Sequence, residues 1–246
     1  MRHLRLFIPT TSYTKHALRS VHITHVSTVP LRSPRKPPPM YNSVPVPFPA
    51  THRPREYTIE NLKTWSCVAE RALPEREAVR AIHIYDFDNT LFLTPMPNSK
   101  IWYGPTLINL GSPTWLVNGG WWHDPRILAA TGEGLEKEEA RAWEGWWNEH
   151  IVQLVKLSMQ QKDALTVLLT GRSVKDYSSL IQRIVKSKGL DFDMTVLKPQ
   201  TMPSGDETST TIAFKCVFLE ELLNTYKEAQ ELRCAILFFG CIVLNR

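Results

Sequence analysis

The chain has 246 residues, of which 43% are hydrophobic and 22% are charged, and its formal net charge is +5. This length allows one sizeable α/β domain with additions. No apolar stretch approaches the ~18 residues that a membrane-spanning helix needs, so the sequence predicts no membrane segment.

The positive charge is confined to the beginning of the chain. No acidic residue precedes Glu56, whereas nine basic residues do, and removing these nine leaves the remainder at −4. The basic balance therefore does not demand a nucleic-acid-binding face on the folded part. The four cysteines, Cys67, Cys216, Cys234 and Cys241, form no CxxC pair and no zinc pattern, which favours reduced thiols in an intracellular protein.

Residues 1–55 contain ten of the 18 prolines. Proline interrupts both helices and strand ladders, so we predict a disordered, basic, proline-rich segment ahead of a domain at 56–246. The first 25 residues are compatible with a mitochondrial presequence. A plain basic tail, or a start at Met40, is the interpretation that we favour, and with it a cytoplasmic or nuclear location.

Apolar runs and helical stripes alternate after residue 80. Strands are predicted at Ile82–Tyr85, Leu165–Leu169, Met194–Leu197 and Ala235–Phe239, and helices at 149–161, Val174–Lys188 and Thr210–Tyr226. Gly189 follows the second helix as a C-terminal cap. Strands that alternate with helices of this length predict a parallel sheet with helices on both faces.

About 75 residues separate the first two strands, where a simple crossover needs only a dozen or more. We predict that residues 93–148 form a flap or small cap over the strand ends. The segment carries seven of the eight tryptophans, namely Trp102, Trp115, Trp121, Trp122, Trp143, Trp146 and Trp147. These could stack on nucleic-acid bases, but a small core of the cap itself is the interpretation that we favour.

Two carboxylates, Asp86 and Asp88, follow the first strand directly, in the run DFDNTLF. Burial of two close carboxylates is costly unless a cation or a chemical task compensates it. Asp86 could act as a nucleophile that forms an aspartyl-phosphate, and Asp88 as the general acid and base. Mg²⁺ suits such an oxygen-only site, with Asp86 and Asp88 as its protein ligands.

The second strand ends in Thr170-Gly171-Arg172, and the carboxyl ends of parallel strands converge on one site. Thr170, Gly171 and Arg172 are therefore predicted to bind a phosphoryl group. A lysine is also needed to neutralise the nucleophile and to hold phosphate. We choose Lys215 for this role, with Lys198 as the competing candidate.

The set of Asp86, Asp88, Thr170 and Lys215 resembles the motifs of the haloacid dehalogenase (HAD) superfamily of phosphohydrolases. More narrowly, the chain resembles the HAD domain of the Swiss Army Knife RNA repair proteins. The closer match rests on DFDNTLF, the GWW at 120–122, the AWEGWWN at 142–148, the KDALT at 162–166 with its LLTGR, and the FK at 214–215. The resemblance implies a HAD-like Rossmannoid sheet, Mg²⁺ and a phosphorylated substrate such as an RNA end.

One departure from the family pattern is predicted to matter. The fourth motif of HAD proteins supplies a carboxylate after the last strand, but no acidic residue follows Glu231 in this sequence. The departure indicates either a truncated reading frame or a degenerate member of the family, with weaker metal binding and reduced turnover.

The leading hypothesis is a Mg²⁺-dependent phosphohydrolase acting on phosphorylated RNA ends, with no obligate protein partner. The alternatives are a phosphatase of small phosphometabolites, and a non-catalytic remnant that binds RNA ends or a protein.

Overall fold

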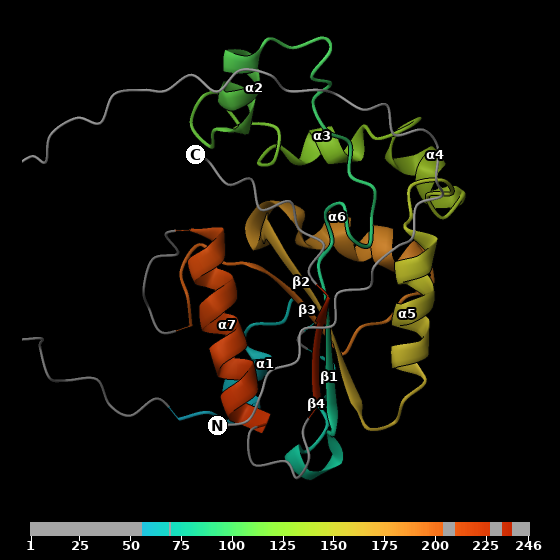
Figure 1. The fold of residues 1–246 in the computed structure, drawn as a ribbon, viewed down its shortest axis with the longest axis vertical. Helices are drawn as coiled ribbons and strands as arrows, with labels where there is room; N and C mark the ends of the chain where they lie inside the picture. The colour runs from blue at the N-terminus through green and yellow to red at the C-terminus, as the bar shows by residue number, and fades with distance from the viewer. Residues whose placement is uncertain (1–55, 69, 204–209, 227–232, 238–246) are drawn as a thin grey trace, which may run out of the picture. The chain divides into compact units, whose positions relative to one another are not determined.

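Four parallel strands form one sheet in the order β3-β2-β1-β4 (Figure 1). The computed structural model describes residues 56–68, 70–203, 210–226 and 233–237. The strands are β1 (Ala81–Tyr85), β2 (Ala164–Ser173), β3 (Met194–Lys198) and β4 (Arg233–Leu237). The predicted α/β fold is confirmed. β4 begins two residues before its predicted position because it pairs in register with β1, from Ala81↔Arg233 to Tyr85↔Leu237.

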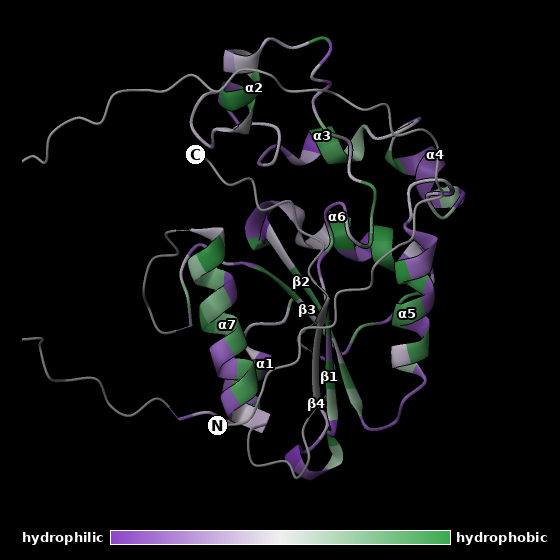
Figure 2. Ribbon diagram, viewed as in Figure 1, coloured by the Kyte–Doolittle hydropathy of each residue, from purple (hydrophilic) through white to green (hydrophobic). Residues whose placement is uncertain are grey.

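Helices cover both faces of the sheet, as predicted (Figure 1). One face carries α5 (Glu149–Met159) and α6 (Val174–Ser187), and the other carries α1 (Ile59–Lys63) and α7 (Thr211–Tyr226). Side chains on a strand alternate between the two faces, so Ile82 and Ile84 of β1 pack toward α7 while Tyr85 packs toward α5. Figure 2 shows both hydrophobic and hydrophilic residues on α5 and α7, as expected for helices with one buried side.

Local sequence explains where two of these helices begin or end. The Thr58 side chain accepts a hydrogen bond from the Asn61 amide and caps α1. Gly189 follows α6 with a φ of +69°, a left-handed conformation that glycine adopts at little cost. The predicted helix at 174–188 is thus confirmed to within one residue.

Residues 93–148 contain three short helices, α2 (Gly104–Gly111), α3 (Pro125–Ala129) and α4 (Leu135–Ala140). They lie beyond the carboxyl ends of the strands (Figure 1). Gly120 fits directly against the end of α2, since an added Cβ would lie 2.1 Å from the Leu110 carbonyl oxygen and 2.5 Å from that of Ser112. The insertion is therefore packed against itself at this point and has no room for a side chain.

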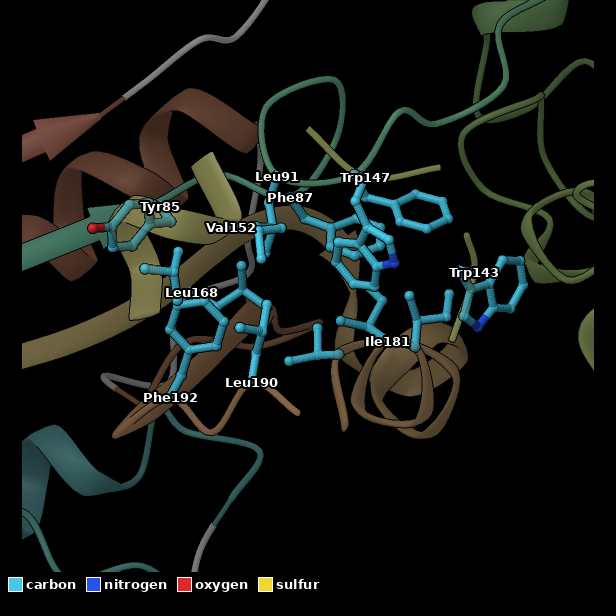
Figure 3. Packing of buried hydrophobic residues seen from close by; sticks show 14 of the residues in the cluster. Tyr85, Phe87, Leu91, Trp143, Trp147, Val152, Leu168, Ile181, Leu190 and Phe192 are labelled. Atoms are coloured by element: carbon cyan, nitrogen blue, oxygen red, sulfur yellow. The ribbon is translucent and has the colours of Figure 1, made fainter. Parts of the chain in front are cut away.

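The last part of the insertion belongs to the main hydrophobic core. Trp143 and Trp147 are buried with Tyr85, Val152 and Ile181 in one cluster (Figure 3). Both indoles meet the Phe92 ring edge-on, with centroids 5.6 and 5.2 Å away. The tryptophans are predicted to form a separate core of the cap, but these two complete the core of the domain. The reason is that the end of the insertion packs against α5 and α6.

Three other aromatic side chains of the insertion are exposed to solvent. Trp102 and Trp115 are 42% and 47% exposed, and Tyr103 is 77% exposed. Stacking of these rings on nucleic-acid bases stays a prediction.

Several predictions fall on residues that the structure does not describe. These are the disorder of residues 1–55, with the domain boundary at 55, and the missing fourth motif at 238–246. Within the described helices, none is long and apolar enough to span a lipid bilayer.

Candidate active site

The loop that carries the two aspartates is closed by its own backbone and anchored by aromatic rings. The amides of Leu91 and Phe92 donate to the carbonyl oxygens of Asp86 and Phe87, at 3.2 and 2.9 Å. Asn89 makes the turn with a φ of +53°, a conformation that asparagine tolerates better than most residues. Because the Phe87 ring stacks on the Phe92 ring at 5.2 Å, the residues on either side of Phe87 are held in place.

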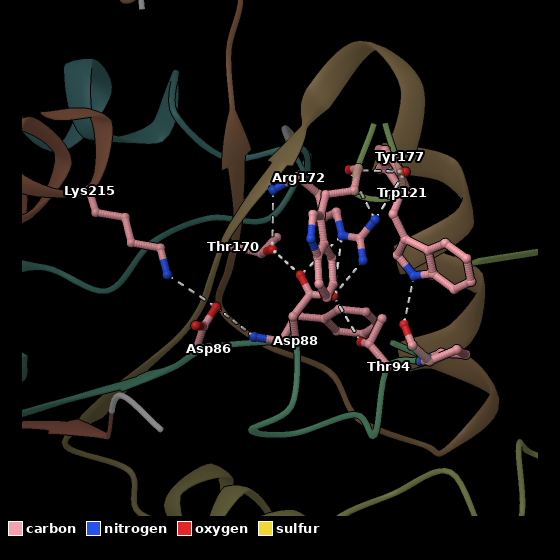
Figure 4. Close-up of polar contacts among 11 residues, drawn as sticks. Asp86, Asp88, Thr94, Trp121, Thr170, Arg172, Tyr177 and Lys215 are labelled. Atoms are coloured by element: carbon pink, nitrogen blue, oxygen red, sulfur yellow. Dashed lines mark hydrogen bonds and ion pairs between the residues drawn. The ribbon is translucent and has the colours of Figure 1, made fainter. Parts of the chain in front are cut away.

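Asp86 forms an ion pair with Lys215 of α7, in which the Lys215 Nζ lies 3.1 Å from the Asp86 Oδ1 (Figure 4). The side chains are only 10% and 18% exposed, respectively. Burial raises the pKa of Asp86 above its usual range, and the charge of Lys215 only partly opposes that effect. Of the two candidate lysines, Lys215 is therefore the one that lies beside the first aspartate.

Asp88 is held by three other side chains (Figure 4). The Arg172 Nε and Nη2 donate to the Asp88 carboxylate at 2.7 to 3.2 Å, and the Thr94 hydroxyl donates to its Oδ1 at 2.8 Å. The Thr170 hydroxyl makes a longer contact with the Asp88 Oδ2, at 3.4 Å. Both carboxylate oxygens of Asp88 therefore accept hydrogen bonds from the protein.

Arg172 reaches Asp88 because β2 bulges at its end. Thr170 pairs with Leu197 and Ser173 with Lys198, so Gly171 and Arg172 are two extra residues on β2. Bulges of this kind redirect side chains near functional sites. The bulge turns Arg172 inward, where its side chain is only 3% exposed.

The predicted phosphoryl-binding residues thus have distinct positions. Thr170 is fully buried, with its hydroxyl between Asp88 and the Arg172 amide, which donates to it at 3.3 Å. Gly171 lies against α7, since an added Cβ would be 2.4 Å from the Thr211 Cγ2. The Arg172 side chain is directed to Asp88 and to two aromatic residues, Trp122 and Tyr177. Phosphate binding by Thr170, Gly171 and Arg172 stays a prediction.

Three contributors to the site were missed from the sequence, namely Thr94, Trp122 and Tyr177. Trp122 was assigned to the insertion, and Tyr177 to the buried stripe of α6. The only available signal was that Tyr177 lies in the first turn of α6, which begins directly after the end of β2 that carries Arg172. Nothing in the sequence around Thr94 indicated its bond to Asp88.

The two carboxylates, Asp86 and Asp88, are compatible with a magnesium ion, although they are few for a metal site. Within the described residues there is no cluster of three His, Cys, Asp or Glu side chains that could hold a metal. Mg²⁺ is commonly held by one or two carboxylates together with substrate oxygens and water, so Asp86 and Asp88 would suffice. The raised pKa of Asp86 supports this fit, because a buried carboxylate gains from a nearby cation.

The geometry allows a defined chemistry. A buried carboxylate beside a lysine, with a second carboxylate two residues further on, could serve as a nucleophile, a charge partner and a proton carrier in one place.

Comparisons with known proteins point to one family. A family model described as "HAD domain family 1 in Swiss Army Knife RNA repair proteins" matches residues 94–234. Thr170 and Lys215 lie inside this range, whereas Asp86 and Asp88 precede it. The uncharacterized protein YMR265C of Saccharomyces cerevisiae is 39% identical over 130 residues, which are 51% of this chain and 27% of that protein. The chain therefore spans much less than the full length of this relative.

Two solved structures of a Pnkp1/Rnl/Hen1 RNA repair complex also match. One is 16% identical, with a TM-score of 0.33, and the match covers 71% of this chain and 47% of the other. The second is 15% identical, with a TM-score of 0.34, and the match covers 68% and 49% of the two chains.

Proposed function

Because the chain belongs to HAD domain family 1 of the Swiss Army Knife RNA repair proteins, we propose that it is a phosphohydrolase of phosphorylated RNA ends. Asp86 is its nucleophile and Asp88 its general acid and base. The observation that carries this proposal is the ion pair of the buried Asp86 with Lys215, at 3.1 Å. A nucleophilic carboxylate that approaches a phosphate dianion needs such a positive charge to offset the repulsion.

The reaction has two steps. In the first, a carboxylate oxygen of Asp86 bonds to phosphorus, the bond from phosphorus to the leaving oxygen breaks, and Asp88, which enters this step in its protonated carboxyl form, donates its proton to that oxygen. In the second, Asp88 takes a proton from water, the water oxygen bonds to phosphorus, and the aspartyl–phosphate bond breaks. The products are an alcohol and inorganic phosphate, and both aspartates return to their initial states.

Other residues of the chain bind and orient the phosphoryl group. Lys215 supplies a charge beside Asp86, and the hydroxyl of Thr170 and the amides that follow it supply hydrogen-bond donors. Asp86 and Asp88 would hold Mg²⁺, which when bound neutralises carboxylate and phosphoryl charge.

The test compares phosphate release by the wild-type chain and by Asp86→Asn, at several Mg²⁺ concentrations. The substrates are a 3′-phosphorylated RNA oligonucleotide, a sugar phosphate and p-nitrophenyl phosphate. The matched control is Asp191→Asn, because Asp191 is also an aspartate in an ion pair, with Arg71 at 2.6 Å. We expect Asp86→Asn to abolish release and Asp191→Asn to leave it unchanged.

Other outcomes favour the alternatives. Faster turnover of the sugar phosphate than of the RNA would assign the domain to small phosphometabolites. RNA binding without release of phosphate that depends on Asp86, even at high Mg²⁺, would assign it to binding rather than catalysis.

A further inference from the structure

Arg172 occupies a position that the proposed reaction does not require of it. Its guanidinium contacts two aromatic rings, with the central carbon 5.0 Å from the centroid of the Trp122 ring and 4.8 Å from that of Tyr177. Cation–π contacts of this kind favour a desolvated guanidinium. The Arg172 side chain is therefore in contact with both the insertion, at Trp122, and α6, at Tyr177.

The edges of the guanidinium are also occupied. Nε and Nη2 hold the Asp88 carboxylate, while Nη1 donates to the Trp122 carbonyl oxygen and to the Tyr177 hydroxyl, each at 3.0 Å. The Tyr177 hydroxyl also donates to the Trp122 carbonyl oxygen, at 3.2 Å. All three nitrogens of Arg172 thus contact protein groups, and a phosphate would have to displace one of these.

We infer that Arg172 is a positioning residue that couples the insertion to the general acid–base Asp88. The Arg172 Nε and Nη2 fix the orientation of the Asp88 carboxylate, and Nη1 of the same guanidinium binds the Trp122 carbonyl oxygen. Because the guanidinium is rigid and planar, movement of the insertion at Trp122 shifts the donors that hold Asp88. The insertion then sets whether Asp88 faces the leaving oxygen.

The neighbouring backbone makes such transmission direct. His123 and Asp124 follow Trp122, and their amides both donate to the Gly120 carbonyl oxygen, at 2.9 and 3.3 Å. Gly120 in turn fits against α2 without room for a Cβ. An unbroken series of contacts therefore joins α2 to the Asp88 carboxylate through Trp122 and Arg172.

The first arm of the test measures the coupling without any enzymatic activity. Hydrogen–deuterium exchange of the His123 and Asp124 amides is compared in the wild type, Arg172→Lys and Tyr177→Phe. Lysine keeps the charge but lacks the fork and the flat stacking surface, so we expect exchange at these amides to become at least about tenfold faster. Tyr177→Phe keeps the ring and loses only its hydroxyl bonds, so its effect should have the same direction and a smaller size.

The matched control for the first arm is Arg71→Lys, because Arg71 also bridges aspartates, Asp191 at 2.6 Å and Asp193 at 3.1 Å, but has no contact with Asp88. This variant should leave exchange at the two amides unchanged. Unaltered exchange in both Arg172→Lys and Tyr177→Phe would overturn the coupling.

The second arm rests on the proposed function and measures turnover. Arg172→Lys should lower kcat on a 3′-phosphorylated RNA by about 100-fold with little change in KM, because a displaced acid–base group impairs the chemical step. Single-turnover release of p-nitrophenolate should fall at least about tenfold less, since that leaving group needs no proton. In an Asp88→Asn background, Arg172→Lys should add less than about a twofold loss.

The outcomes of the two arms can be separated. Equal losses from Arg172→Lys with and without Asp88, or a raised KM at unchanged kcat, would show that Arg172 acts on the substrate and would overturn the inference. Absence of wild-type turnover would refute the proposed function alone, since the exchange arm still measures the coupling. If Arg172→Lys does not fold, Tyr177→Phe carries both arms.

Discussion

The close approach of β2 and α7 at Gly171 leads to the most detailed prediction. A Cβ at this position would lie 2.4 Å from the Thr211 Cγ2, 3.2 Å from its Oγ1 and 3.4 Å from its Cβ. Ordinary contacts between such atoms begin near 3.4 Å. The substitution Gly171→Ala therefore forces a separation of about 1 Å, unless the Thr211 side chain rotates away.

The displacement bears on the site because Thr211 and Lys215 are four residues apart on α7. Residues at this spacing lie one above the other on the same side of a helix. A shift of about 1 Å at Thr211 would carry the Lys215 Nζ from 3.1 Å to about 4 Å from the Asp86 Oδ1, the limit of an ion pair. We expect a loss of about 1–3 kcal/mol in stability from the overpacking, and up to about 100-fold in turnover.

The measurement is thermal unfolding together with Mg²⁺-dependent phosphate release for four chains. These are the wild type, Gly171→Ala, Thr211→Ala and the double variant. Removal of the Thr211 methyl and hydroxyl leaves only the contact at 3.4 Å, so the double variant should regain most of the lost stability and turnover. Gly111→Ala is the control, because nothing lies within 4 Å of its added Cβ.

Two results would refute this reasoning. If Gly171→Ala has the melting temperature and turnover of the wild type, the exposed Thr211 side chain has rotated and β2 has not moved α7. If the double variant is as impaired as Gly171→Ala, the loss arises elsewhere than at the Thr211 contact.

Three further predictions concern stability. Trp143→Ala should lower the free energy of unfolding by about 3–5 kcal/mol, measured by chemical denaturation, because Trp143 is fully buried against Phe92; a loss below about 1 kcal/mol would contradict its place in the core. Gly120→Ala should raise hydrogen exchange across α2, since the obstructing atoms are backbone oxygens that no rotamer change can move, whereas Gly104→Ala should not. Burial lowers the pKa of His83, and the charge of Asp163 only partly opposes this effect. Below pH ~6.5 His83 therefore takes up a proton in the unfolded chain but resists it in the folded chain. The contribution of His83 to the free energy of unfolding is fully present above that pH and falls as the pH decreases, by at most about 1.4 kcal/mol per pH unit. His83→Gln should remove this part of the pH dependence and His150→Gln, at an exposed position, should not; equal pH profiles for the wild type and His83→Gln would refute it.

Sequence periodicity was enough to predict the sheet and its major helices. Strands buried on both faces are nearly continuous apolar runs, as at 165–169, where Thr166 is the one polar residue, and α6 ends at a glycine with a positive φ. The predicted start of β4 at Ala235 was two residues too late, because pairing with β1 already includes Arg233 and Cys234, whereas the predicted residues 238–239 lie outside the described part of the chain. Pairing partners depend on tertiary structure, which a local pattern does not contain.

The candidate site was predictable where convergence of strand ends determines it, and at Lys215, which was chosen from the sequence and lies beside Asp86. The placement of Asp86, Asp88 and Thr170 near one another follows from parallel strands that share an edge. The bulge at Gly171 and Arg172 could not be predicted in the same way, because the register of β2 is set by its pairing with β3. Without the bulge, the direction of the Arg172 side chain and its contacts with Trp122 and Tyr177 could not be predicted.

The position of Trp143 and Trp147 against Phe92 constrains how this domain can be shortened or can diverge. A chain that joined Phe92 directly to Asn148 would keep the four described strands of the sheet, yet it would leave the stacked Phe87 and Phe92 rings open to water beside Asp86. The insertion therefore cannot be deleted without exposing part of the hydrophobic core. The two tryptophans and Phe92 should therefore change only together.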